Sequence, residues 1–228
     1  MMSNILVIAA HPDDELLGVG GTIRRHVDNG DIVDCIILGE GMTSRAQKRE
    51  EWDKSTLDEL KNQTLKAAEI IGYRNVCFSD FPDNRFDSVD LLDIIKEVDR
   101  YIQSFKPQII YTHHYGDLNI DHRRTFEAVI TATRPGAECC VKEIYCFETP
   151  SSTEWNFMYG ENVFKPNVYI GIDDTIDAKL RAMECYESEI RDYPHPRSIK
   201  ALEIIAARWG TVVGKNYAEA FELIRRVV

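Results

Sequence analysis

The stretch ILVIAAHPDDELLG, residues 5–18, joins a continuous apolar run to three consecutive carboxyl groups. The run at 4–10 has the length of a strand, and its unbroken apolar character is typical of a strand buried on both faces of a sheet. Asp13, Asp14 and Glu15 follow almost at once. In open α/β sheets ligands bind beyond the carboxyl ends of the strands. The stretch therefore predicts both a fold class and the place of a functional site.

The rest of the chain alternates apolar runs with amphipathic segments. We expect further strands at 31–38, 75–80, 108–114, 141–148 and 167–172. We expect helices at 15–30, 45–71, 88–105, 121–134 and 176–190, followed by a tail of mixed character. Strands separated by helices need crossover connections, which give a parallel sheet covered on both sides. The sequence predicts an α/β, Rossmann-like three-layer fold with a mostly parallel sheet, forming a single domain over residues 1–228.

Composition and charge narrow the function classes. The net charge of -11 over 228 residues argues against nucleic acid or an anionic membrane as the main partner. No apolar stretch approaches the length of about 18 residues that a membrane span needs. The amino-terminal residues do not resemble a secretion signal, and the six cysteines include no C-x-x-C pair, as expected for reduced thiols in a cytoplasmic protein. The oligomeric state stays open, a homo-oligomer included.

Two polar clusters follow strands that we expect to end on the same rim of the sheet. The first is AHPDDE at 10–15, and the second is THHYGDLNIDHR at 112–123. His11 and Asp14 could hold a metal with His122 as the third ligand, because two histidines and one carboxylate form a known catalytic zinc set. Zinc lowers the pKa of bound water towards about 7 and so makes hydroxide available at neutral pH.

Asp13 is left over beside this set, and such a carboxylate can take the proton of the water and return it to a leaving amine. The alternative is structural, since aspartates are favoured at helix N-termini. The second cluster, with His113, His114 and Asp121, favours the metal site. A dinucleotide site is disfavoured, because a phosphate at this helix start would meet carboxylates.

AHPDDE, together with the later Asp121–His122 pair, resembles the LmbE/PIG-L family of zinc-dependent N-acetylglucosaminyl deacetylases. The stretches GMTSR at 41–45 and HPRS at 195–198 are also similar to bacterial members. The resemblance implies one zinc ion, or another divalent metal, held by His11, Asp14 and His122. It also implies that Asp13 is the general base and acid.

One position departs from the family pattern. Several of these deacetylases carry a histidine three residues before the last ligand, where it is thought to stabilise the oxyanion, and this chain has Asn119 there. An amide can donate a hydrogen bond but cannot act as a cationic acid. Asn119 would then do a milder version of the task, or His113, His114 or His195 would replace it, with His114 and His195 preferred.

The loops after the second and third strands supply candidates for substrate binding. Arg45, Asp83 and Arg85, with Asn84 between the last two, could recognise sugar hydroxyls or an anionic group on the substrate, although such residues are equally common in plain turns.

Two further candidates are aromatic or lie in the tail. Trp155 could stack on a sugar, although packing is the commoner role. Tyr217 and Glu219 are expected in a helix rather than in the pocket.

These observations predict a zinc-dependent hydrolase that removes the N-acetyl group from an N-acetylglucosamine-type amino sugar or its conjugate. A second hypothesis keeps the metal but changes the conjugate, for example an amide on a thiol or an antibiotic. A third is a carbohydrate- or metal-binding module without catalysis. The presence of Asp13 favours catalysis over binding alone.

Overall fold

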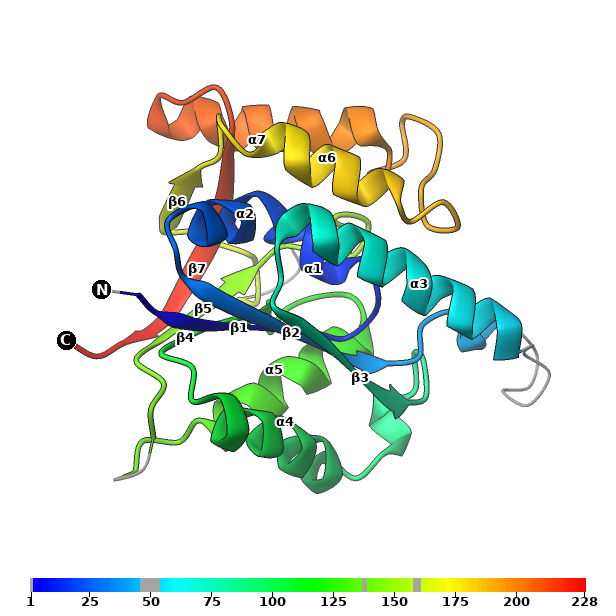
Figure 1. Ribbon diagram of the computed structural model, residues 1–228, viewed down its shortest axis with the longest axis vertical. Coiled ribbons are helices and arrows are strands. Elements are labelled where there is room, and N and C mark those ends of the chain that lie inside the picture. The colour runs from blue at the N-terminus through cyan, green and yellow to red at the C-terminus, as the bar shows by residue number, and fades with distance from the viewer. Residues whose placement is uncertain (1, 46–53, 137–138, 158–160) are drawn as a thin grey trace.

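The computed structural model describes residues 2–45, 54–136, 139–157 and 161–228. A seven-stranded sheet runs through the molecule in the order β3-β2-β1-β4-β5-β7-β6 (Figure 1). The strands are β1 (Asn4–Ala9), β2 (Ile32–Gly39), β3 (Asn75–Phe81), β4 (Ile109–His113), β5 (Glu143–Phe147), β6 (Val168–Gly171) and β7 (Ala218–Arg226). β1 to β5 are parallel to one another, and β7 pairs antiparallel with both β5 and β6.

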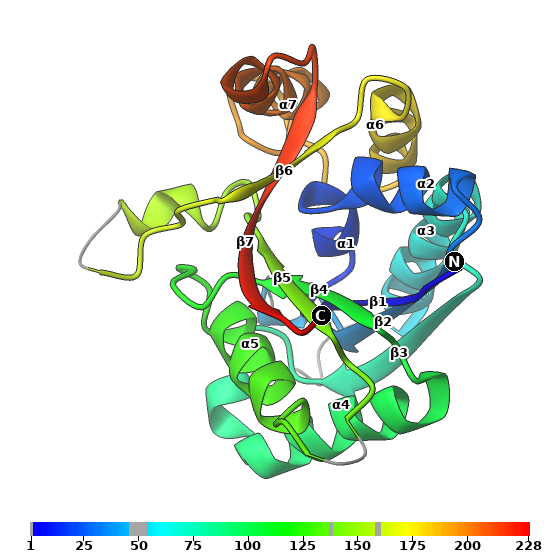
Figure 2. The same cartoon turned by 90° about the vertical axis from the view of Figure 1, so that its left-hand side faces the viewer.

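Helices cover both faces of this sheet, which confirms the three-layer prediction. The α-helices are α1 (Asp14–Leu17), α2 (Gly20–Asp28), α3 (Lys54–Ile71), α4 (Leu91–Phe105), α5 (Ile120–Ala132), α6 (Ile176–Glu184) and α7 (Ile199–Val213). Figure 2 shows α4 and α5 on one side, and α1, α2, α3 and α6 on the other. Short 3-10 helices lie at η1 (Thr43–Arg45), η3 (Phe86–Ser88) and η4 (Glu154–Asn156).

β1 is central because its side chains supply both layers of the core. Ile5 and Val7 pack into the cluster under α2, α3 and α6, while Leu6 and Ile8 pack into the cluster over α4 and α5. These four side chains are at most 1% exposed. Since successive side chains of a strand point to opposite faces, an unbroken apolar run is what this double burial requires.

The helix expected at 15–30 is broken in two. α1 ends at Leu17, and α2 begins only at Gly20. At Gly18, between them, an added Cβ would lie 2.1 Å from Cδ2 of Phe147, at the end of β5. The aromatic ring therefore packs directly on the backbone at the break, and only glycine leaves room for it.

The segment containing Tyr217 and Glu219 is a strand, so the helix expected there was wrong. β7 starts at Ala218, and the Tyr217 hydroxyl donates to Glu203 on α7, 3.0 Å away. Glu219 is 4% exposed, and its carboxylate accepts the backbone N–H groups of Gly21 and Thr22 and the ammonium of Lys179. A buried charge partnered in this way is compatible with an inner strand, which sequence periodicity does not reveal.

Other boundaries differ more modestly. The expected helix at 45–71 appears as η1 and α3, and residues 46–53 lie outside the described part of the chain. α6 stops at Glu184 rather than at 190. The tail of mixed character contains α7, capped at its start by the Ser198 side chain and ended by Gly214 in the left-handed conformation.

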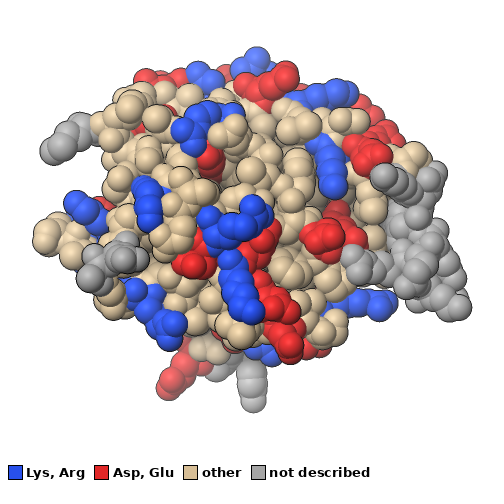
Figure 3. Space-filling view, turned by 60° about the horizontal axis from the view of Figure 1, so that its bottom comes forward, with Lys and Arg blue, Asp and Glu red and all other residues tan. Residues whose placement is uncertain are grey.

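The outer surface of α4 and α5 carries charges of both signs. Figure 3 shows acidic and basic side chains side by side on this face. Three pairs are spaced three residues apart along the helices: Asp93–Lys96, Glu97–Arg100 and Arg124–Glu127. Exposed pairs of this kind stabilise a helix only slightly, and they make the surface hydrophilic. No helix in the described ranges combines the length and apolar character needed to cross a membrane.

The buried Lys179–Glu219 pair joins α6 to β7, so its removal should be costly. The Lys179 Nζ atom lies 2.6 Å from Glu219 Oε1 and 3.0 Å from the Leu17 carbonyl oxygen. We expect Lys179→Met to lower the free energy of unfolding by about 3–5 kcal/mol, because it leaves a buried carboxylate unpaired. Urea denaturation would measure this. Lys96→Met, at a side chain that is 67% exposed, is the matched control, and equal losses in the two variants would contradict the prediction.

Candidate metal centre

The first polar cluster is a tight turn between β1 and α1. The His11 backbone N–H donates to Asp14 Oδ2 at 2.8 Å, which closes the turn. Asp13 has a φ of 95°, a left-handed conformation that is uncommon for a residue with a side chain. Its N–H donates to the Glu15 carboxylate at 3.0 Å, and Glu15 in turn accepts the Tyr186 hydroxyl at 2.5 Å. The strained backbone is thus held by buried hydrogen bonds.

Three ligand-type atoms meet beside this turn. The His11 Nδ1, Asp14 Oδ2 and His122 Nε2 atoms form a triangle whose three sides are each 3.3 Å. Tetrahedral zinc with bonds of about 2.0–2.1 Å holds its ligand atoms about 3.3–3.4 Å apart. The second oxygen of Asp14, Oδ1, is buried and has no hydrogen-bond partner among the described residues. Both the spacing and the donor set fit a zinc ion.

Each of the two histidines has a carboxylate behind it. His11 Nε2 lies 2.8 Å from Asp121 Oδ2, and His122 Nδ1 lies 3.1 Å from Asp117 Oδ1. Asp117 also accepts the hydroxyls of Ser152 and Thr153. Such outer carboxylates fix the tautomer and orientation of a ligating imidazole and raise its basicity. The arrangement leaves His11 Nδ1 and His122 Nε2 directed to the same point.

A second group of possible ligands shares His11 through its other nitrogen. His11 Nε2, Asp83 and Asp121 also lie close enough to hold an ion. Both oxygens of Asp121, however, already accept backbone N–H groups, from Asn84 at 2.6 Å and from Phe86 at 2.9 Å. The triangle around Asp14 is therefore the better candidate.

The charges in this cluster support one another. Burial alone would raise the pKa of Asp14, but the neighbouring His122 and His113 outweigh it and hold that pKa well below its ordinary value. Burial opposes the charged form of His122, yet Asp14 and Asp117 raise its pKa to about 9. A concentration of negative charge around two imidazoles is what attracts a divalent cation.

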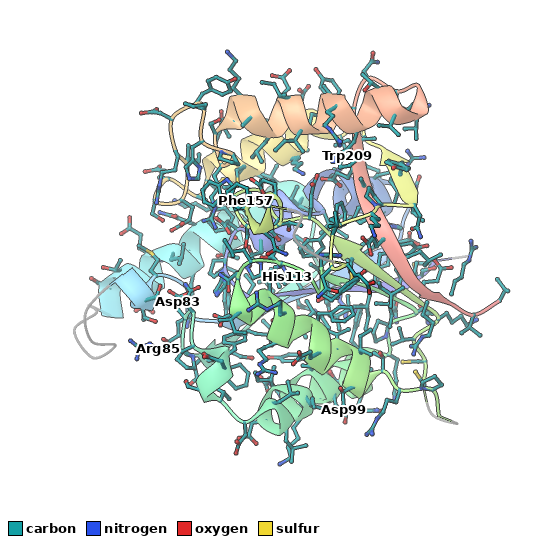
Figure 4. All side chains as sticks on the ribbon, turned by 180° about the vertical axis from the view of Figure 1, so that it is seen from behind. Asp83, Arg85, Asp99, His113, Phe157 and Trp209 are labelled. Atoms are coloured by element: carbon teal, nitrogen blue, oxygen red, sulfur yellow. The ribbon has the colours of Figure 1, made fainter. Side chains whose placement is uncertain are left out.

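His113 is a structural neighbour rather than a ligand. Its Nε2 accepts the Ala10 N–H at 2.9 Å, and its Nδ1 pairs with the Thr149 hydroxyl at 3.1 Å. Burial lowers its pKa to about 3, so the ring is neutral. It stacks on the His122 ring with the centroids 3.9 Å apart. Figure 4 shows His113 near the middle of the molecule.

His114 points away from the cluster. Its Nε2 lies 3.3 Å from Glu222 on β7, its Nδ1 accepts the Gly116 N–H, and its ring contacts Phe164. These contacts take it towards β7, whereas His113, one position earlier, packs on His122. Adjacent residues at a strand end face in different directions.

A small cavity of about 80 Å³ opens beside the triangle. The described residues that line it are His11, Pro12, Asp13, Gly41, Met42, Ser44, Leu60, Asp83, Asn84, Asn119, Glu189 and Arg197. The structure therefore brings Asp13, Asp83 and Asn119 together with His11. His114, His195 and Arg85 are not in this lining.

Arg197 is the principal residue that the sequence did not single out. Its Nη1 lies 3.0 Å from Asp13 Oδ2 and 3.2 Å from Glu189, and its Nε donates to Ser151 at 2.8 Å. Burial raises the pKa of Asp13 well above its ordinary value, and the Arg197 charge opposes this. The pair spans 184 positions of sequence, so the only available signal was the resemblance of HPRS to bacterial relatives.

The Asn119 side chain is held in the cavity wall by hydrogen bonds. Its side-chain oxygen accepts the Asp121 N–H at 2.8 Å and so caps α5, and its Nδ2 donates to Asn84 Oδ1 at 2.9 Å. Asp83 accepts both the backbone and the hydroxyl of Ser44. The fixed amide thus continues the polar rim formed by Asp83 and Asn84.

The remaining predicted residues lie farther out. His195 accepts the Arg197 N–H through Nδ1, and its ring meets the edge of Trp155 with the centroids 5.6 Å apart. Arg85 is exposed, and Figure 4 shows it extended outwards at the edge of the molecule. Arg45 is the last residue of η1, and its side chain lies outside what the structure describes.

Comparison with known proteins agrees with this site. The model of the family described as PIG-L, GlcNAc-PI de-N-acetylase, matches residues 6–133, which is more than half of the chain. The chain belongs to the PIG-L family. The matched range contains both polar clusters, and the resemblance drawn from AHPDDE and Asp121–His122 is confirmed.

The proteins that this chain resembles are named for different activities. A diacetylchitobiose deacetylase of Thermococcus kodakarensis is 26% identical over 98% of this chain and 84% of its own length. A 4-oxalmesaconate hydratase of Pseudomonas putida is 28% identical over 79% of this chain and 71% of its own length. The crystal structure of a conserved protein from Thermus thermophilus has the same fold, with a TM-score of 0.78 and 22% identity over 100% of this chain and 97% of that chain.

The triangle can be tested by metal content. We expect the purified protein to bind one zinc ion per chain and His122→Ala to lose it, because the variant removes one of three ligands. His114→Ala is the matched control and should keep the metal, since His114 faces Glu222. Elemental analysis after dialysis against zinc measures both. Equal metal content in the two variants would exclude His122 as a ligand.

Proposed function

We propose that this protein is a zinc-dependent hydrolase that removes the N-acetyl group from an N-acetylglucosamine-type amino sugar or its conjugate. The observation that carries the proposal is the carboxylate of Asp13, which lines the same cavity as His11 of the metal-ligand triangle but belongs to neither group of possible ligands. A zinc ion held by His11, Asp14 and His122 would supply Lewis acidity to the acetamide carbonyl and would acidify water.

Asp13 is suited to moving the proton. Its Oδ2 is bound to Arg197, and burial raises its pKa well above the ordinary value. A carboxyl group that binds a proton more readily than usual can take it from the attacking water and deliver it to the leaving nitrogen. The amide C–N bond breaks, the carbonyl carbon gains the water oxygen, and acetate and a free amine result.

The oxyanion requires a donor, and the cavity wall favours Asn119 over His114. Asn119 lines the cavity, whereas His114 contacts Glu222. His195 accepts the backbone N–H of Arg197 and does not line the cavity, so it would act only through Arg197. Asn119 would therefore perform, as a neutral donor, the task given to a histidine in several relatives.

The polar rim suggests how a sugar is held. Asp83, Ser44 and Asn84 form a linked set of donors and acceptors at the cavity, suited to hydroxyl groups. Arg45 and Arg85 remain candidates for binding an anionic group of the substrate, farther from the cavity.

The six cysteines form no disulfide, which supports a reducing compartment, and we propose the cytoplasm.

The hydratase among the relatives gives the competing hypothesis, because adding water to a double bond can also use a metal and a base. Product analysis separates the two. We expect acetate and a primary amine to be released from N-acetylglucosamine or diacetylchitobiose with zinc present, and release to stop when a chelator removes the metal. Turnover of 4-oxalmesaconate, without any amine release from a panel of acetamido sugars, would favour the hydratase.

The role of Asp13 predicts a specific defect. We expect Asp13→Asn to lower kcat by about 10²–10⁴-fold while the zinc content stays at one per chain, because general acid–base catalysis contributes about that much. Asp99→Asn is the control. Its side chain lies on α4, away from the site, and bonds only to Gln103 among the described residues (Figure 4). Near-normal turnover by metal-loaded Asp13→Asn would refute the assignment.

A further inference from the structure

A second and larger cavity lies between α7 and the loops that follow β5. Its volume is about 420 Å³, within the range of small-molecule sites. Aromatic and aliphatic side chains dominate its walls, among them Phe164, Trp209, Tyr193 and Ile204. Figure 4 shows Trp209 on α7, on the opposite side of the sheet from Asp99.

Several polar groups of this cavity already have partners within the protein. The Trp209 indole N–H donates to Glu148, and the Arg208 guanidinium lies 3.9 Å from the centre of the Trp209 ring. Glu154 accepts the backbone N–H groups of Ser151 and Ser152. The aromatic and aliphatic side chains therefore supply most of the surface that the cavity offers to a ligand, and an apolar group gains by entering it.

The cavity is a direct neighbour of the metal centre. Pro196 lines it, while the next residue, Arg197, lines the small cavity and binds Asp13. Thr153 also lines it, and the Thr153 hydroxyl donates to Asp117, the carboxylate behind His122. The two cavities are therefore separated by a single thickness of chain on the same rim of the sheet.

The mouth of the cavity is accessible and apolar. Tyr193 is 54% exposed, and Ile204, one turn into α7, is 47% exposed. These side chains present apolar surface to solvent at the edge of a concave site. An exposed apolar patch around a pocket commonly marks where a ligand or a partner binds.

We infer that this second cavity binds an apolar alkyl or aryl group attached to the amino sugar, while the acetamido group of the sugar reaches into the small cavity. The inference rests on the proposed deacetylase function, because it gives the substrate a second part. It assigns to α7 and to the loop after β5 a part in choosing the substrate, and none in the chemistry.

The experiment compares the methyl and hexyl glycosides of N-acetylglucosamine, both below micelle-forming concentrations. Each methylene that becomes buried contributes about fourfold in binding. We expect the wild-type kcat/KM to be at least about tenfold higher for the hexyl glycoside. Ile204→Asp should abolish this preference and leave the methyl glycoside unaffected. Val212→Asp, on the same helix at a side chain that is 54% exposed and outside the cavity, should keep the preference.

Calorimetry with hexyl glucoside, which has no acetamide, separates this inference from the proposed function. Binding by the wild type and by Val212→Asp but not by Ile204→Asp, without deacetylation of any glycoside, would support the cavity and refute the deacetylase. Deacetylation of both glycosides with equal kcat/KM and no binding of hexyl glucoside would overturn the inference. Dissociation of an oligomer by Ile204→Asp, with the chain-length preference unchanged, would also overturn it and mark the cavity as a contact between copies.

Discussion

The pairing of each inner imidazole with an outer carboxylate is the interaction on which this molecule's site depends. Asp121 and Asp117 hold His11 and His122 from behind, and each carboxylate is itself fixed by hydrogen bonds from another segment. The loop after β3 donates its backbone to Asp121, and the loop after β5 donates hydroxyls to Asp117. Segments that follow β1, β3, β4 and β5 thus all contact this cluster. The positions of its side chains therefore depend on all four segments.

The sequence predicted most of the fold because the strongest signal came from the most buried element. The run at 5–10 is apolar and buried at every position, as a strand covered on both faces by helices requires. The signal weakened towards β7, where Glu219 interrupts the pattern. That carboxylate is tolerated only because Lys179 and the start of α2 reach it from 40 and about 200 positions away, and a local pattern does not contain such partners.

For the site, the sequence indicates candidates whose residue type suits metal binding. It does not indicate residues whose role depends on the direction in which the side chain points. His11, Asp14 and His122 could be chosen because metal ligands have few residue types and two strand ends meet on one rim. The sequence could not show which of His113 and His114 lies beside the candidate ligands. The answer depends on the direction of each side chain: His113 stacks on His122, and His114 lies beside Glu222. Arg197 was missed for another reason: an arginine in a loop is ordinary until the fold brings it 3.0 Å from Asp13.

The position of β7 has a consequence for how the protein folds. β6 pairs with no strand but β7 in the described sheet, yet about 46 residues, including α6 and α7, separate the two in sequence. During synthesis β6 therefore leaves the ribosome without a neighbour and must wait for β7 before it can join the sheet. The half of the molecule that contains the candidate metal ligands can assemble first around β1 and β4, and the edge that carries the apolar cavity is completed last.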